Sequence, residues 1–181
     1  IVKKGVGKVI EVNNAIHLDD LPGITGIGHT RWATHGKVTD TNAHPHSSNS
    51  GKIAIVHNGI IENFQELKDG LISDGYNFQS DTDTEIIANL IQKNFEKTSD
   101  VKQSIIDTVS NLKGHYAFVV IFDDGTLAAA RFHEPLIVGV GKSSHYLSSD
   151  VLGFIERTDD AIYIDNRDFV IVNDAGLEIY N

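Results

Sequence analysis

Helical and strand-like patterns occupy separate parts of this chain, and their grouping constrains the fold more than any other feature. Apolar residues recur at helical spacing in three neighbouring segments: residues 60–73, the segment that follows the capping-box pattern Thr82-x-x-Glu85, and residues 101–113. From residue 115 onwards, short apolar runs alternate with Gly, Asn and Asp turns and predict seven strands, at 115–122, 126–132, 136–140, 145–148, 161–164, 169–172 and 177–180. Because helices and strands are grouped rather than alternating, the order predicts an α+β layered sandwich with mostly antiparallel sheets.

The amino-terminal part carries weaker signals. Residues 24–30 and 52–57 are typical of short strands, and each run ends at a polar motif. The first 23 residues show little pattern. The candidate functional residues lie in and after those two polar motifs.

Length and composition limit the class of protein. The 181 residues fit one domain, and 40% apolar with 22% charged residues is typical of a soluble globular protein. A net charge of −10 argues against nucleic acid or an anionic membrane as the main partner. No apolar run approaches the roughly 20 residues of a membrane-spanning helix. The chain has no cysteine, which excludes disulfides and thiolate metal sites within it, and it begins at Ile1 with no methionine anywhere, so we expect a piece of a longer protein.

Residues 28–36, GHTRWATHG, combine an arginine with the only tryptophan of the chain. The guanidinium of Arg31 has the planar geometry that clamps a carboxylate through two parallel hydrogen bonds, although a surface ion pair is the alternative. Trp32 is either a core anchor or part of a loop that closes over a ligand. The polar Thr34 and His35, followed by Gly36, favour the loop.

Residues 57–63, HNGIIEN, and 82–85, TDTE, supply complementary groups. Asn58-Gly59 is a common turn sequence, but the Asn58 side-chain amide and the Gly59 backbone N–H are also suited to an oxyanion hole. Asp83 stands where a helix is expected to start. It is therefore either a helix cap or the acceptor for a ligand ammonium group.

Several histidines raise the question of a metal site. His35, His44, His46 and His57 lie close together in sequence, and His44-Pro45-His46 has a spacing seen among metal ligands. Neither an HExxH motif nor a cluster of acidic residues accompanies them, so we expect no metal and no other cofactor. The imidazoles are instead expected to orient loops through hydrogen bonds.

Taken together, four motifs resemble the glutaminase domain of class II glutamine amidotransferases, which are N-terminal-nucleophile hydrolases. They are HTRWATHG at 29–36, NAHPH at 42–46, HNGIIEN at 57–63 and TDTE at 82–85. The resemblance runs in order from about Gly7 to Asn181 and includes LSSD at 147–150. Trp32 and His44 favour the branch of the family in which ammonia from glutamine passes to fructose 6-phosphate.

The resemblance implies a fold and a role for each candidate residue. The family fold is a four-layer αββα sandwich. By similarity, Arg31 would bind the α-carboxylate of glutamine and Asp83 its α-ammonium group, while Asn58 and Gly59 would form the oxyanion hole. Trp32, Thr34 and His35 would belong to the loop that closes over glutamine, with Trp32 also gating ammonia transfer.

The resemblance also implies parts that this chain lacks. The family's mature chain begins with a cysteine, whose thiol attacks the glutamine amide while its own α-amine acts as base. We therefore expect residues 1–181 to be one glutaminase domain without its amino-terminal segment and without the sugar isomerase domain that would follow Asn181. Neither Thr30 nor Thr34 can replace the nucleophile, so this piece alone is not expected to hydrolyse glutamine.

The expected partners are glutamine and the sugar isomerase domain, in a cytoplasmic homodimer with no nucleic acid or membrane partner. Two alternatives stay open at this point. One is the glutaminase domain of another class II amidotransferase with a different acceptor. The other is a glutamine-binding module that has lost catalysis.

Overall fold

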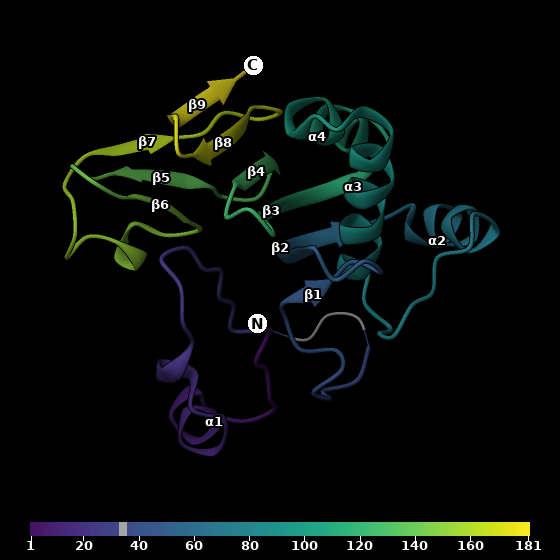
Figure 1. Ribbon diagram of the computed structural model, residues 1–181, viewed down its shortest axis with the longest axis horizontal. Helices are drawn as coiled ribbons and strands as arrows, with labels where there is room; N and C mark the ends of the chain where they lie inside the picture. Colours follow the sequence, from purple (N-terminus) through teal and green to yellow (C-terminus); the bar gives the residue numbers. More distant parts are fainter. Residues whose placement is uncertain (33–35) are drawn as a thin grey trace.

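The computed structural model describes residues 1–32 and 36–181. It combines a six-stranded sheet, a three-stranded sheet and a group of helices beside the larger sheet (Figure 1). The helices are α1 (Val9–Ile16), α2 (Phe64–Ser73), α3 (Thr84–Thr98) and α4 (Val101–Val109), with 3-10 turns η1 (Leu18–Asp20) and η2 (Val151–Gly153). The strands are β1 (His46–Ser47), β2 (Ile53–Ile61), β3 (Gly114–Phe122), β4 (Leu127–Phe132), β5 (Ile137–Val140), β6 (His145–Ser148), β7 (Ala161–Tyr163), β8 (Phe169–Asn173) and β9 (Gly176–Tyr180).

Both sheets are antiparallel. The larger has the strand order β1-β2-β3-β4-β8-β9, and the smaller has the order β6-β5-β7. β2 and β3 are paired along their whole lengths, from Ile53 opposite Phe122 to Ile61 opposite Gly114. This long ladder carries the residues of the HNGII motif inside the sheet.

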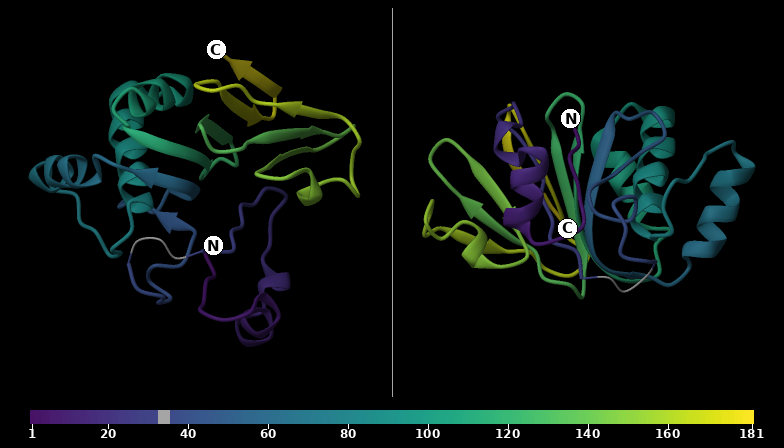
Figure 2. Two further views of the ribbon diagram at one scale, coloured as in Figure 1. Left: turned by 180° about the vertical axis from the view of Figure 1, so that it is seen from behind. Right: turned by 90° about the horizontal axis from the view of Figure 1, so that it is seen from below.

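Two apolar cores hold the layers together. Because side chains alternate between the faces of a strand, Phe118 and Val120 of β3 face α3 and α4, whereas Ala117 and Val119 face the three-stranded sheet. The view from below shows the helices on one side of the larger sheet and the smaller sheet on the other (Figure 2). The expected α+β class with antiparallel sheets is confirmed, and the layers run from helices to sheet to sheet.

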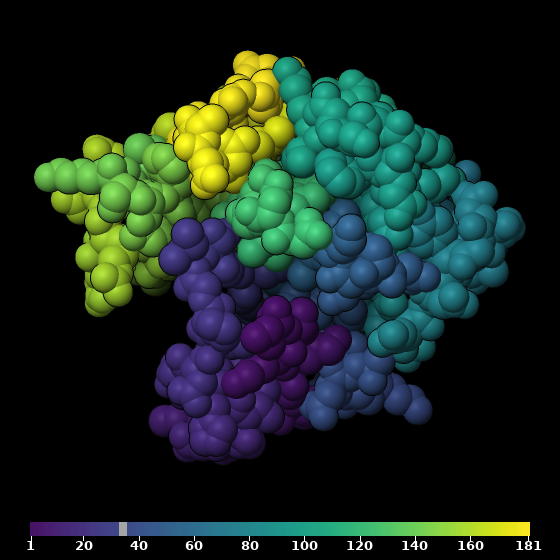
Figure 3. Space-filling view, viewed as in Figure 1, coloured from purple at the N-terminus to yellow at the C-terminus, as the bar shows by residue number. Residues whose placement is uncertain are grey.

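The amino-terminal residues form a lobe beside the sandwich, coloured purple in Figure 3. Helix α1 buries none of its side chains, and Val9 and Ile10 are exposed. Lys4 ties this lobe to the body, since its Nζ donates to the carbonyl oxygens of Thr41 and Ala43, each at 3.0 Å. Among the described residues, no helix is both long and apolar enough to cross a membrane.

The seven strands expected from residue 115 onwards are confirmed, with ends that shift by at most one residue. The helix expected at 101–113 is also present but ends earlier, at Val109. The strand expected at 24–30 is wrong. Gly26 and Gly28 lower its strand propensity, and the backbone hydrogen bonds of the described residues do not join this segment to a neighbouring strand.

The helix expected from Ile60 begins only at Phe64, because pairing with β3 keeps Ile60 and Ile61 in β2. Tertiary pairing here overrides the helical spacing of the apolar residues. α1 and the two-residue strand β1 were not expected from the sequence. α1 buries none of its side chains against the body. β1 has only two residues, which is too short for a period in the sequence to be recognised.

Candidate functional site

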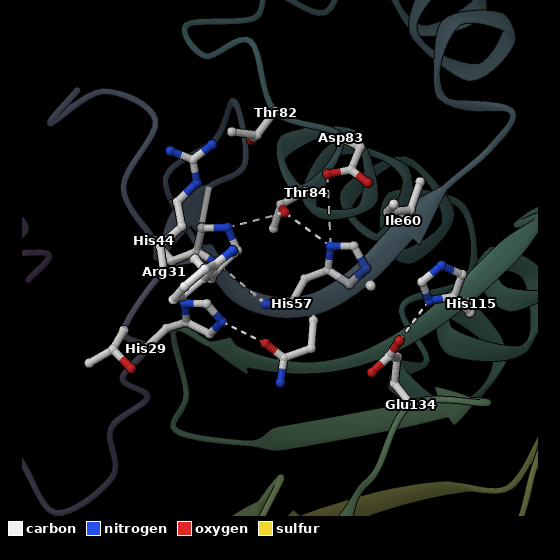
Figure 4. Close-up of a pocket in the computed structure, with 14 residues that line it drawn as sticks. His29, Arg31, His44, His57, Ile60, Thr82, Asp83, Thr84, His115 and Glu134 are labelled. Carbon is white, nitrogen blue, oxygen red and sulfur yellow. Dashed lines mark hydrogen bonds and ion pairs between the residues drawn. The ribbon is translucent and has the colours of Figure 1, made fainter. Parts of the chain in front are cut away.

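A pocket of about 270 Å³ opens where the carboxyl-terminal half of β2 meets the start of α3 and residues 29–32 (Figure 4). The structure brings five of the seven predicted site residues to its wall: Arg31, Trp32, Asn58, Gly59 and Asp83. The other two, Thr34 and His35, lie outside the described residues. Residues that are far apart in the sequence thus line one cavity.

Asn58 and Gly59 lie inside β2, so the interpretation of this pair as a simple turn is wrong. Gly59 has φ of +113°, and a Cβ built there would lie 2.1 Å from the carbonyl oxygen of His115 on β3. Only glycine suits this combination of backbone angle and close approach. The Oδ1 atom of Asn58 lies 2.8 Å from Nε2 of His29, which orients the amide at the pocket wall.

Asp83 occupies the N-cap position of α3, but its side chain makes no capping hydrogen bond. Instead Oδ2 accepts from the backbone N–H of Ile61 at 2.9 Å, and Oδ1 lies 4.0 Å from Nδ1 of His57. The carboxylate is buried at 7% exposure and lines the pocket. The interpretation of Asp83 as a plain side-chain cap is therefore wrong.

The capping box predicted for Thr82 and Glu85 is also wrong. α3 begins at Thr84, and the buried carboxylate of Glu85 accepts from the backbone N–H groups of Gln79 and Ser80 and from the Ser80 hydroxyl. These bonds hold the turn that leads into Asp83.

Arg31 and Trp32 also line the pocket. Nη1 of Arg31 donates to the carbonyl oxygen of Lys37 at 3.2 Å. Trp32 is 88% exposed, so it is not a core anchor. Its exposure is compatible with a closing loop, which stays a prediction.

Three histidines contact Thr82 and Thr84 at the start of α3, but His46 and His57 do so from strands β1 and β2 rather than from loops. Thr84 Oγ1 lies 3.1 Å from Nδ1 of His57 and 3.4 Å from Nε2 of His44, while Thr82 Oγ1 lies 3.1 Å from Nε2 of His46. Burial lowers the pKa of His44 to about 2 and that of His46 to about 3. Burial also lowers the pKa of His57, against the opposing attraction of Asp83. All three imidazoles are therefore neutral at pH 7.

No metal centre is evident in the part of the chain that the structure describes, where no group of three or more His, Cys, Asp or Glu side chains has a suitable arrangement. The four histidines considered above include His35, which lies outside that part.

Two features of the pocket were not anticipated from the sequence. One is the contact between His29 and Asn58. The other is a contact at the wall, in which Nδ1 of His115 lies 2.6 Å from Oε1 of Glu134. The β2–β3 register places His115 opposite Ile60, beside Gly59, and that pairing is the signal that would have located it.

Comparison with known proteins agrees with this geometry. A family model described as a glutamine amidotransferase domain matches residues 29–155, which is more than half of the chain. The chain belongs to the family of class II glutamine amidotransferase domains. The resemblance read from the motifs is thereby confirmed.

The relatives point to one branch. The chain is 48% identical, over 95% of its length, to the glutamine–fructose-6-phosphate aminotransferase (isomerizing) of Pyrococcus horikoshii, and covers 29% of that protein. It is 44% identical, over its whole length, to the enzyme of the same name from Aquifex aeolicus, and covers 31% of it. The chain thus spans about 30% of the length of the curated relatives it matches.

Solved structures give the same fold. The glutamine phosphoribosylpyrophosphate amidotransferase of B. subtilis superposes with a TM-score of 0.71 at 28% identity, over 84% of this chain and 34% of that one. A structure described as the allosteric regulatory enzyme of purine biosynthesis gives a TM-score of 0.76 at 26% identity, over 94% of this chain and 38% of that one. These neighbours are N-terminal-nucleophile hydrolases, so that fold with its antiparallel sheets is confirmed. Of the four layers expected, the described residues show three, which are helices, sheet and sheet.

Proposed function

We propose that this chain is the glutamine-binding and glutamine-hydrolysing part of an enzyme that passes the released ammonia to fructose 6-phosphate. The observation that carries the proposal is a single pocket lined by a guanidinium, a buried carboxylate, and an amide next to a glycine N–H. A free amino acid with an amide side chain presents a carboxylate, an ammonium group and a carbonyl oxygen. The pocket offers one partner to each.

Arg31 is the proposed partner of the α-carboxylate, since a guanidinium donates two parallel hydrogen bonds to such a group. Asp83 is the proposed partner of the α-ammonium group. Its Oδ2 is engaged by the Ile61 N–H, which fixes the carboxylate in place and leaves further lone pairs for a ligand. Trp32, Thr34 and His35 are proposed to close over the bound amino acid.

Asn58 and Gly59 are proposed to act during the chemistry. When a nucleophile adds to the side-chain amide carbon, negative charge develops on the carbonyl oxygen. The Asn58 amide and the Gly59 N–H would stabilise that oxyanion. The sum of the reaction is glutamine plus water giving glutamate plus ammonia. The family's nucleophile is a cysteine thiol, and the 181 residues contain no cysteine, so we assign the attacking group to none of them.

The acceptor is proposed from the relatives. Those with 40–48% identity are named glutamine–fructose-6-phosphate aminotransferase (isomerizing), a name that specifies both donor and acceptor. We accordingly propose that residues 1–181 form one glutaminase domain. In a longer protein it would act with a sugar isomerase domain, which would convert fructose 6-phosphate and ammonia into glucosamine 6-phosphate. A homodimer in the cytoplasm is part of the same proposal.

The proposal is tested by steady-state kinetics on the protein at its natural length. Arg31→Ala should raise KM for glutamine strongly with a smaller change in kcat, because a carboxylate clamp acts in the ground state as well as in the transition state. Asn58→Ala should lower kcat by roughly 10²–10³-fold with little change in KM, because the oxyanion exists only during the reaction.

Matched controls are Arg157→Ala and Asn14→Ala, which alter exposed residues outside the pocket and should leave both parameters unchanged. The same kinetic signature in Arg31→Ala and Asn58→Ala would refute the assigned roles. Formation of glutamate without glucosamine 6-phosphate, when fructose 6-phosphate is supplied, would refute the acceptor.

A further inference from the structure

The side-chain amide of Asn58 can face the pocket in two ways. Its two ends are similar in shape but opposite in chemistry, because the NH2 end donates hydrogen bonds and the oxygen end only accepts them. An amide that presents Nδ2 to the pocket would stabilise an oxyanion. The same amide rotated by 180° would present Oδ1 and repel it. A neighbouring group must therefore hold the Asn58 amide in one of these two orientations.

The contact of Asn58 with His29 makes that selection possible. Oδ1 of Asn58 lies 2.8 Å from Nε2 of His29. Since the amide oxygen can only accept, this contact is a hydrogen bond only when Nε2 carries the proton. The other ring nitrogen, Nδ1, is buried and has no hydrogen-bond partner among the described residues. Leaving Nδ1 unprotonated avoids a buried N–H group without an acceptor, so both nitrogens favour the same tautomer.

The position of the His29 ring is itself fixed. It stacks on His44 with ring centroids 4.3 Å apart and an angle of 24° between the planes. His44 is held in turn by Thr84 Oγ1 and by the backbone N–H of His57, which donates to Nδ1 of His44 at 3.4 Å. Figure 4 shows this group, with His29 beside His44 and a dashed line from the His29 ring to an oxygen on the pocket wall. His57, the neighbour of Asn58 in the sequence, thus holds His44, and the His29 ring that contacts Asn58 stacks on His44.

We propose that His29 is a positioning residue which, through its Nε2–H, holds the Asn58 amide with Nδ2 facing the pocket and so prepares the oxyanion hole. The inference deepens the proposed function and rests on it. His29 itself touches no reacting atom in this scheme. A protonated His29 also carries Nε2–H, so the contact persists in either protonation state, whereas a general base would lose its role on protonation.

The test is a double-mutant cycle on the protein at its natural length, with glutamate release as the assay. His29→Leu removes the donor and keeps an apolar side chain, and His29→Gln places an amide NH2 at a similar reach. We expect His29→Leu to lower kcat roughly 10–100-fold with KM changed less than about threefold, a smaller loss than complete removal of an oxyanion donor. His29→Gln should restore most of kcat.

The decisive comparison is made in the Asn58→Ala background. If His29 acts only through Asn58, adding His29→Leu to Asn58→Ala should lower kcat no further. His145→Leu is the control, because His145 lies on β6 outside the pocket and should have no effect. Equal losses from His29→Leu with and without Asn58, or an unchanged kcat in His29→Leu, would overturn the proposal.

A second readout remains valid if His29→Leu fails to fold or if no glutaminase activity is found. Nitrogen-15 NMR of the wild-type imidazoles reports which ring nitrogen carries the proton. We expect His29 to be the Nε2–H tautomer in the free protein. The Nδ1–H tautomer would overturn the orientation directly. Absence of activity together with the Nε2–H tautomer would instead refute the proposed function and leave the orientation of Asn58 intact.

Discussion

Gly59→Ala tests the feature of the backbone on which the pocket depends most. Gly59 has φ of +113°, and an added Cβ would meet the His115 carbonyl oxygen at 2.1 Å and the Tyr116 Cα at 2.9 Å. Both obstacles are backbone atoms, which cannot rotate away as a flexible side chain does. The change therefore forces β2 away from β3 at the point where Asn58 and Asp83 converge.

Substitutions at other glycines separate the cost of the backbone angle from the cost of the steric overlap. A side chain in a sparsely populated backbone region costs about 1–3 kcal/mol, and steric overpacking costs about 1–3 kcal/mol more, so Gly59→Ala should destabilise the domain by about 2–6 kcal/mol. Gly51 has φ of +72°, but an added Cβ there would have nothing within 4 Å, so Gly51→Ala should cost only about 1–2 kcal/mol. Gly70 lies in α2 with open space around it, and Gly70→Ala should stabilise by about 0.5–1 kcal/mol.

Differential scanning calorimetry of the natural-length protein measures all three variants. The transition that moves in Gly51→Ala and Gly70→Ala identifies this domain. At roughly 2–4 °C per kcal/mol for a domain of this size, the central values of about 4 and about 1.5 kcal/mol mean that Gly59→Ala should lower the Tm of this domain about two and a half times as far as Gly51→Ala. Equal shifts in the two variants would show that β2 and β3 do not approach each other closely at Gly59, and the oxyanion hole would then not require a glycine at this position.

Two further predictions concern pH and the tryptophan. Burial lowers the pKa of His44 to about 2 and of His46 to about 3, and lowers that of His57 as well, whereas an unfolded histidine titrates near 6.5. The unfolded state therefore binds more protons below about pH 6.5, so Tm should fall as the pH drops from 7 to 5; a constant Tm over this range would contradict the burial of these imidazoles. Trp32 is 88% exposed, so its fluorescence should be typical of a water-exposed indole and should shift to shorter wavelength when glutamine is added. No shift in a protein shown separately to bind glutamine would refute the closing loop.

The sequence predicted which residues line the pocket better than it predicted the secondary structure that holds them. The resemblance to the family implies ligand-binding roles for Arg31, Asn58, Gly59 and Asp83, and all four line one pocket. Their individual roles stay predictions. Local sequence patterns nevertheless predicted the wrong secondary structure around these residues. Asn-Gly favours a turn when only its neighbours in sequence are considered, but the ladder between β2 and β3 holds it in an extended strand.

Asp83 and His29 show why the side-chain contacts of the site could not be predicted from the sequence. The sequence around Asp83 is typical of a helix cap, yet its acceptor atoms are used by an N–H group 22 residues away, at Ile61. The partner of His29 is 29 residues away. The Asp83 contact depends on how β2 lies against the start of α3, and the His29 contact depends on how the segment around residue 29 lies against β2. No period or spacing along the chain encodes either arrangement. To predict these contacts, the register between β2 and β3 would have had to be known first.

The buried histidines explain how Asp83 can remain available to a ligand. His57 Nδ1 lies 4.0 Å from Asp83 Oδ1, so a charged imidazole there would compete with a ligand ammonium group for the carboxylate. Asp83 acts to raise the pKa of His57, but desolvation by burial is the larger effect and lowers it. The imidazole therefore stays neutral, and Nδ1 is satisfied by Thr84 Oγ1 at 3.1 Å. In the proposed function, the burial of His57 thus leaves the negative charge of Asp83 available to the ammonium group of the amino acid. His57 Nδ1 has a hydrogen-bond partner in Thr84 Oγ1 and does not need an ion pair with Asp83.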